Sequence, residues 1–361
     1  MKMWIKGAVL GAVLASTSMS GTAFANATST LYDVGYRTHD LVVQDFYARP
    51  GSPDHIRLNY REWYSPSATD VLVYVHGMQS HSQWFNESGD ELAARGFNVY
   101  AVDRRGSGLS GGKRGHIYTP FQWIADLAQV IGFVRAKNPG KHLHLMGNSF
   151  GGRLVMTYAE AFPDTIDTLI LETPATAGRV SLPAEEIIEA QYYMWKYYPT
   201  PLHDDLFTSN PDKLAFMAQD KLGIRRITAN MYKMEGLINV GNLMPQNMAR
   251  ITMPLLMLLS NNDRIVDTPA VISGVYDRVA SIKKKLVRYD DVEHYLLFED
   301  KHEEVLNEIA NWMNSFTPPA ARAFAPVKAA TALAGDEEAG NWIDDVREEA
   351  DRMGWSPEPA K

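Results

Sequence analysis

The sequence predicts an α/β fold whose mainly parallel sheet is covered by helices. Strand-like and helix-like segments alternate from residue 71 to residue 316, and several of the strands are continuous apolar runs. Apolar strands of this kind are typical of a parallel sheet that is buried on both faces. Alternation at this spacing indicates a sheet with helices packed against it. Polar residues gather where these strands end, which is the usual place for active residues in such a sheet.

Eight strands are expected. The first two, residues 40–49 and 55–65, flank a Pro- and Gly-containing turn and should form an antiparallel hairpin. The other six are expected at residues 71–77, 98–103, 142–148, 168–173, 254–260 and 284–290. Helical patterns lie between them, at residues 91–95, 121–137, 150–162, 269–280 and 299–316.

Composition excludes several classes of chemistry. The chain of 361 residues has no cysteine, so it has no disulfides, thiolate nucleophiles, cysteine zinc sites or iron–sulfur clusters. The formal net charge of -8 argues against a nucleic-acid partner, because phosphate neutralisation needs a basic face. A catalytic nucleophile would therefore be an oxygen.

The two ends of the chain are predicted to lie outside the catalytic unit. Lys2 and Lys6, an apolar stretch at residues 7–15 and the sequence Ala23-Phe24-Ala25 form a secretory signal pattern. We expect cleavage after Ala25 and a periplasmic or secreted mature protein. Residues 317–361 read as a Pro/Ala-rich linker followed by an acidic tail.

A long interruption separates the strand ending at residue 173 from the strand starting at residue 254. A connection of about 80 residues exceeds a normal loop, so residues 175–250 are expected to form an inserted cap. Its aromatic cluster includes Tyr193, Trp195 and Tyr198, which are candidate contacts for an acyl chain or an aromatic ester. Simple packing of the cap onto the sheet explains these side chains equally well.

The strongest motif is Gly147-Asn148-Ser149-Phe150-Gly151, which lies between a predicted buried strand and a helix. The pattern G-x-S-x-G in this context is a tight turn that exposes a nucleophilic serine above the sheet. Ser149 is the candidate nucleophile.

A serine hydroxyl needs a base, and the base needs a carboxylate that orients it. Asp263 and His294 each follow a later strand, in the order Ser, Asp, His that accompanies this turn. Asp267 stands before Thr268-Pro269 and is better suited to capping a helix. His142, His144 and His302 are interpreted as structural.

Acyl transfer also requires backbone donors for the oxyanion. The candidates are the N–H groups of Phe150, directly after the nucleophile, and Met78, in the loop after the strand at 71–77. His76 is expected to brace that loop. The glycine-rich run at 106–111 matches G-x-G-x-x-G, but no helix can start there, so we interpret it as a wall of the catalytic cleft.

Taken together, these segments resemble the monoacylglycerol lipase and lysophospholipase branch of the α/β-hydrolases, which includes serine aminopeptidase-like members. The resemblance is carried by HGMQSHSQWF, YAVDRRGSGLSGGKRGHI, GNSFGG, SNNDRIVD and YDDVEHYLLFE. It spans roughly residues 40–316 and implies a core at 26–174 and 251–316, an eight-stranded sheet and a helical cap. Asn148 and Ser107 stand where the family often has histidine.

The resemblance implies a serine ester hydrolase with Ser149, Asp263 and His294 as its triad and with no cofactor or metal. It implies a small-molecule or lipid ester as substrate and transient contact of the cap with a membrane surface. The sequence leaves two alternatives open: an aminopeptidase that uses the same triad, and a non-catalytic binding protein of this fold. It leaves the oligomeric state open as well.

Overall fold

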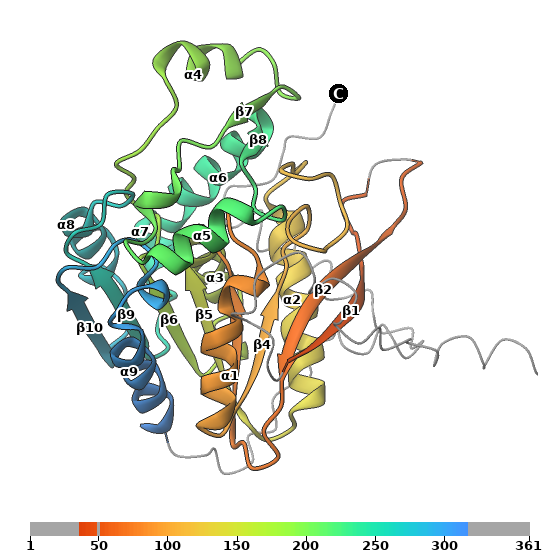
Figure 1. Cartoon of the computed structure of the whole chain (residues 1–361). Helices are drawn as coiled ribbons and strands as arrows, with labels where there is room; N and C mark the ends of the chain where they lie inside the picture. Colours follow the sequence, from red (N-terminus) through yellow and green to blue (C-terminus); the bar gives the residue numbers. More distant parts are fainter. Residues whose placement is uncertain (1–35, 49–50, 317–361) are drawn as a thin grey trace, which may run out of the picture.

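A computed structural model describes residues 36–48 and 51–316 (Figure 1). The predicted signal peptide and the linker and tail at residues 317–361 lie outside the described residues.

The main sheet has eight strands in the order β1-β2-β4-β3-β5-β6-β9-β10. The strand β2 pairs antiparallel with β1 and β4, and all other neighbouring pairs are parallel. The predicted α/β fold and its hairpin are therefore confirmed. The strands are β1 (Arg37–Gln44), β2 (His55–Trp63), β3 (Asp70–Val75), β4 (Phe97–Val102), β5 (His142–Asn148), β6 (Thr168–Glu172), β9 (Leu255–Ser260) and β10 (Lys284–Tyr289).

Helices cover both faces of the sheet (Figure 1). On one face, apolar side chains of α2 (Phe121–Lys137) and α3 (Phe150–Ala161) pack on the sheet in one hydrophobic cluster. On the other, α1 (Asn86–Ala94) and α9 (His302–Asn314) belong to a second cluster. Strands β3, β4, β5, β6 and β9 are buried along their whole length, as their apolar sequences predict.

Three predicted helices differ from the structure. The first, expected at residues 91–95, is α1, which begins five residues earlier and runs over Asn86–Ala94. The pattern at 269–280 forms only α8 (Thr268–Val271) and the π-helical turn η6 (Ile272–Tyr276). The last helix begins at His302 rather than near residue 299, after the 3-10 turn η7 (Leu296–Phe298). Glu299 is extended because its carboxylate accepts the Ser209 N–H at 2.8 Å and the Ser209 hydroxyl at 3.1 Å.

The segment between β6 and β9 lies over the carboxyl ends of the strands (Figure 1). It is built mainly of helices and also contains a two-stranded antiparallel ribbon of β7 and β8, which the sequence patterns did not predict. Its longest helix, α6, is tied to α3 by Asn242, whose Oδ1 accepts the Thr157 hydroxyl at 2.7 Å. Its elements are α4 (Ala184–Ala190), β7 (Tyr197–Pro199), η5 (Asp204–Leu206), α5 (Pro211–Gln219), β8 (Arg226–Thr228), α6 (Ala229–Asn242) and α7 (Pro245–Met248).

None of the helices within the described ranges combines the length and the apolar character that crossing a bilayer requires.

Candidate active site

Ser149 occupies a sharp turn between β5 and α3. Its φ of 53° and ψ of -116° are rare for a residue with a side chain, so the turn stores backbone strain at this serine. The neighbouring glycines allow the turn to fit against the sheet. A Cβ atom on Gly151 would lie 2.1 Å from the Val75 carbonyl oxygen, and one on Gly147 would lie 2.5 Å from the Gly151 carbonyl oxygen. The G-x-S-x-G spacing thus has a direct steric cause.

His294 and Asp263 lie side by side on loops that follow neighbouring strands. Asp263 comes after β9 and His294 comes after β10, and their Oδ2 and Nδ1 atoms are 2.7 Å apart. The other oxygen of Asp263 accepts the N–H groups of Ile265 and Val266, each at 2.8 Å. Both side chains are buried. The carboxylate is therefore fixed by three hydrogen bonds and aligned on the imidazole.

The second ring nitrogen of His294, Nε2, is buried and has no hydrogen-bond partner among the described residues. The histidine loop is linked to the nucleophile strand through Thr173, whose hydroxyl donates to the His294 carbonyl oxygen at 3.0 Å. Asn148, the residue before the nucleophile, donates its Nδ2–H to the Thr173 hydroxyl at 3.3 Å. A short chain of hydrogen bonds thus connects the serine turn to the histidine loop.

The backbone N–H groups of Met78 and Phe150, two buried residues near Ser149, are among those without an acceptor in the part of the chain that the structure describes. Unpaired buried N–H groups are rare, because they lose their bonds to water without replacement. The Met78 loop lies against the nucleophile, since a Cβ atom on Gly77 would be 3.2 Å from Ser149 Cβ. These are the two N–H groups that the sequence proposes as oxyanion donors.

His76 lies inside this loop. Its Nδ1 is 2.9 Å from the Gly77 carbonyl oxygen, and its Nε2 accepts the Arg104 N–H at 3.1 Å. The side chain is fully buried and holds the loop from behind. Arg104 contacts the same loop, and sequence reasoning missed it. The only signal was its place directly after Asp103, at the end of β4.

Glu172, at the end of β6, is buried beneath the nucleophile turn, and its backbone carbonyl accepts the Ser149 N–H at 2.9 Å. Burial raises the pKa of its carboxyl group to about 8, although the N–H groups of Leu297 and Leu296 and the Asn148 side chain act in the opposite direction. Glu172 therefore retains its proton at neutral pH.

The three aromatic residues proposed as substrate contacts occupy different environments. Tyr198 is buried in a small core of the cap with Leu182, Ala190 and Ala229, where its role is packing. Trp195 is partly exposed and lies over the His116 ring, with a centroid separation of 4.9 Å. Tyr193 is largely exposed.

The glycine-rich loop at 106–111 does not open a helix, because the next helix, α2, begins at Phe121. The residues directly after the loop contact the cap. The Gly115 carbonyl oxygen accepts the Thr228 N–H at 2.9 Å, and Arg114 reaches the Leu222 carbonyl oxygen. This segment joins the core to the cap.

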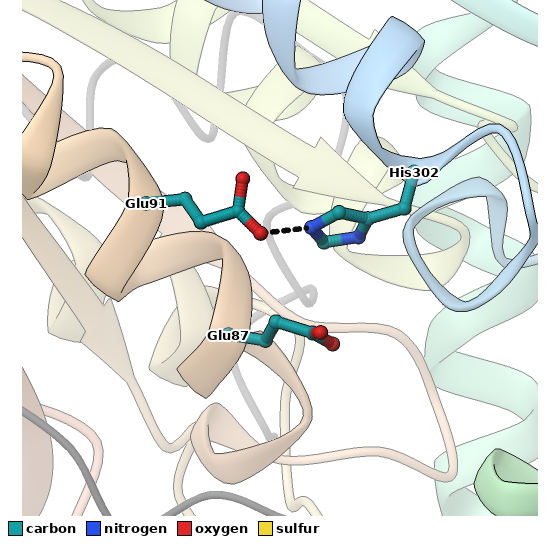
Figure 2. A group of neighbouring side chains, drawn as sticks. All are labelled: Glu87, Glu91 and His302. Atoms are coloured by element: carbon teal, nitrogen blue, oxygen red, sulfur yellow. Dashed lines mark hydrogen bonds and ion pairs between the residues drawn. The ribbon is translucent and has the colours of Figure 1, made fainter.

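Away from this site, Glu87, Glu91 and His302 form a group with the chemistry of metal ligands (Figure 2). Figure 2 shows the Glu91 carboxylate directed at His302, with Nε2 and Oε1 3.0 Å apart. Each carboxylate already has a cationic partner, because Lys213 binds Glu87 and Arg95 binds Glu91 at 2.9 Å. These contacts form an ion-pair network that joins α1, α5 and α9.

Comparison with known proteins identifies the family. Residues 66–301 match the model of the family described as serine aminopeptidase, S33, over well more than half of the chain. The chain belongs to this family. It is thus an α/β-hydrolase, as its sheet order and flanking helices show independently.

Several relatives of this chain are named as lipases. A monoacylglycerol lipase of Mycolicibacterium smegmatis is 27% identical over 267 residues, which cover 72% of this chain and 94% of that protein. The human monoglyceride lipase is 24% identical, and the match covers 74% of this chain and 89% of that protein. The crystal structure of a Paleococcus ferrophilus monoacylglycerol lipase is 25% identical with a TM-score of 0.62, and the match covers 72% of this chain and 98% of that one.

Proposed function

We propose that the protein is a serine hydrolase that cleaves carboxylic esters through Ser149, His294 and Asp263. The observation that carries this proposal is the arrangement at His294. Its Nδ1 is held at 2.7 Å by an oriented carboxylate, and its Nε2 is buried and free. A histidine held in this way is set to accept a proton at Nε2.

The proposed reaction has two halves. His294 Nε2 takes the proton of the Ser149 hydroxyl, and the Ser149 oxygen attacks the ester carbonyl carbon to form a tetrahedral oxyanion. The N–H groups of Met78 and Phe150 bind that oxyanion. The imidazolium returns its proton to the leaving alcohol, which leaves an acyl-serine. Water, activated by His294, then attacks this acyl-enzyme and releases the acid.

The substrate class we favour is a lipid with one acyl ester, such as a monoacylglycerol or a lysophospholipid. The names of the relatives support it, and so does the surface of the cap. A group of exposed apolar residues lies on the outer helix α4 and directly after it, and this helix lies far from the sheet (Figure 1). The group consists of Ile187, Ile188, Tyr192, Tyr193, Met194 and Trp195. We propose that this cap patch contacts the lipid surface that carries the substrate.

A panel of substrates tests the reaction type. Wild type and Ser149→Ala are compared on p-nitrophenyl esters of increasing chain length, monoacylglycerol, lysophospholipid and aminoacyl amides. We expect hydrolysis of the esters by the wild type, higher activity on the lipid esters, and loss of activity in the variant. The family's description makes an aminopeptidase the alternative. Activity on aminoacyl amides alone would favour that alternative over ester hydrolysis.

Export is also proposed, from the sequence pattern at residues 1–25. The intact mass of protein recovered from an exporting bacterium tests it. The expected mature chain begins at Asn26, and a protein that retains Met1 would contradict cleavage.

A further inference from the structure

Arg104 is a buried cation that forms no ion pair with a carboxylate of the described residues. Its Nη2 donates to the carbonyl oxygens of Gly77 and Met78, at 2.7 and 3.2 Å, while its Nε and Nη1 have no partner among the described residues. Burial lowers the pKa of this guanidinium to about 9, and Asp103 and Glu235 partly oppose that effect, so the group is charged at neutral pH. The neighbouring Arg105, in contrast, is neutralised by Asp126 at 2.6 Å and Asp45 at 2.7 Å.

The Gly77 carbonyl oxygen accepts two side-chain hydrogen bonds. One comes from Arg104 Nη2 and the other from His76 Nδ1, at 2.9 Å. The Arg104 backbone N–H donates to His76 Nε2 at 3.1 Å, which places the ring proton on Nδ1. Arg104 therefore acts on Gly77 directly, through its side chain, and indirectly, by setting the tautomer of His76.

This geometry fixes the direction of the Met78 N–H. A peptide unit is planar, and in the trans form its C=O and N–H point in opposite directions. The described residues contain no cis peptide, so holding the Gly77 oxygen on the Arg104 side turns the Met78 N–H to the opposite side. Gly77 also lies against Ser149, as its packing shows. Donors on a peptide carbonyl additionally polarise the N–H of the same unit.

We propose that Arg104 is a positioning residue that aims and polarises the Met78 N–H for the oxyanion, by holding the Gly77 carbonyl from behind. This inference rests on the proposed function. An unpaired buried guanidinium is unfavourable for folding, so stability alone does not account for it. A fixed positive charge behind an oxyanion donor, however, favours the transition state. The guanidinium also lies 5.0 Å from the centre of the side-chain ring of Phe150, the residue whose N–H is the second proposed donor.

The test compares wild type with Arg104→Met and Arg104→Lys. Fluorophosphonate labelling to completion counts the competent active sites, and circular dichroism checks folding. We expect Arg104→Met to lower kcat for a soluble p-nitrophenyl ester by about 10- to 100-fold, which is somewhat less than loss of a whole oxyanion donor. KM should change little. The kcat of Arg104→Lys, which keeps the charge, should lie between the kcat of wild type and that of Arg104→Met. Affinity for an alkyl boronic acid, which forms a tetrahedral adduct, should fall in parallel with kcat.

Several results would overturn the inference. One is a folded Arg104→Met variant with kcat and boronic acid affinity within twofold of wild type. A higher KM of Arg104→Met with an unchanged kcat would also contradict it. Failure of the wild type to react with the fluorophosphonate would instead reject the proposed function, and the inference with it.

A structure of the wild-type boronate adduct keeps the inference testable if the Arg104→Met variant does not fold. The expected result is an adduct oxygen within hydrogen-bond distance of both the Met78 N–H and the Phe150 N–H, with Arg104 still bound to the Gly77 carbonyl. An adduct oxygen held by other donors, with the Met78 N–H turned away, would overturn the inference.

Discussion

Asp263 and His294 are joined by a 2.7 Å contact between Oδ2 and Nδ1, while the second oxygen of Asp263 is held by two backbone N–H groups. The contact gives the imidazole one defined orientation. Because Asp263 accepts from Nδ1, the ring nitrogen left to act as a base is Nε2.

Replacing Asp263 by Asn should lower kcat strongly with little change in folding. An amide can donate to Nδ1 and so favour the wrong tautomer, and in comparable triads this effect is about 10⁴-fold. Ester hydrolysis and thermal unfolding measure the two quantities. The matched control is Asp267→Asn, because Asp267 caps α8 by accepting the Ala270 N–H at 3.1 Å. Equal loss of activity in both variants would contradict our assignment of the acid.

The tight serine turn should not tolerate a methyl group at Gly151. A Cβ atom there would lie 2.1 Å from the Val75 carbonyl oxygen, so Gly151→Ala should lower the free energy of unfolding by about 3 kcal/mol. The control is Gly274→Ala in the turn η6, where a Cβ atom meets nothing within 4 Å. Urea denaturation should show that variant to be as stable as wild type or about 0.5 kcal/mol more stable. Similar stability of both variants would contradict the packing.

Glu172 should make the protein less stable as the pH rises. Its pKa is about 8 in the folded protein against an ordinary 4.5, so between these values the folded state holds one proton more than the unfolded state. The free energy of unfolding of wild type therefore falls, relative to Glu172→Gln, by up to about 1.4 kcal/mol per pH unit in this window.

Urea denaturation at pH 5.5 and pH 8 measures that change. The gain in stability from Glu172→Gln should be larger at pH 8, whereas the exposed Glu303→Gln should show almost no difference between the two pH values. A gain that does not depend on pH would contradict a protonated Glu172.

The cap patch should bind lipid surfaces. Ile188 is 63% exposed on α4, and Ile188→Asp should reduce sedimentation with phosphatidylcholine vesicles and hydrolysis of vesicle-borne monoacylglycerol several-fold. Hydrolysis of a water-soluble acetate ester should not change. Ile282→Asp is the control, because Ile282 is fully exposed next to the amino end of β10, whereas the cap lies over the carboxyl ends of the strands. If both variants lower vesicle binding equally, the patch is not the contact.

Much of the sheet follows from local pattern, because buried parallel strands are apolar throughout and several helices end at glycine or proline. Helix α2 and strand β5 have the bounds that the sequence predicts. The late start of α9 does not follow from local pattern, since it depends on the contact of Glu299 with Ser209 in the cap. The β7–β8 ribbon has only three residues in each strand, which is too short for a periodic signal.

The candidate site also contains residues that the sequence predicts and residues that it does not. Ser149 has a motif, and Asp263 and His294 have an order along the chain and a position at strand ends. Arg104 has neither, because its role depends on contacts with Gly77 and Met78, more than 25 residues earlier in the chain. The environments of Tyr193, Trp195 and Tyr198 depend on how the cap folds, so composition alone could not separate a packed side chain from an exposed one.

The most direct measurement is mass spectrometry of the protein after treatment with a fluorophosphonate. We predict one adduct, on the peptide that contains Ser149, together with loss of ester hydrolysis in proportion to labelling. We also predict no adduct and no hydrolysis in Ser149→Ala. An unmodified Ser149 in an active enzyme, or full hydrolysis by Ser149→Ala, would show that Ser149 is not the nucleophile.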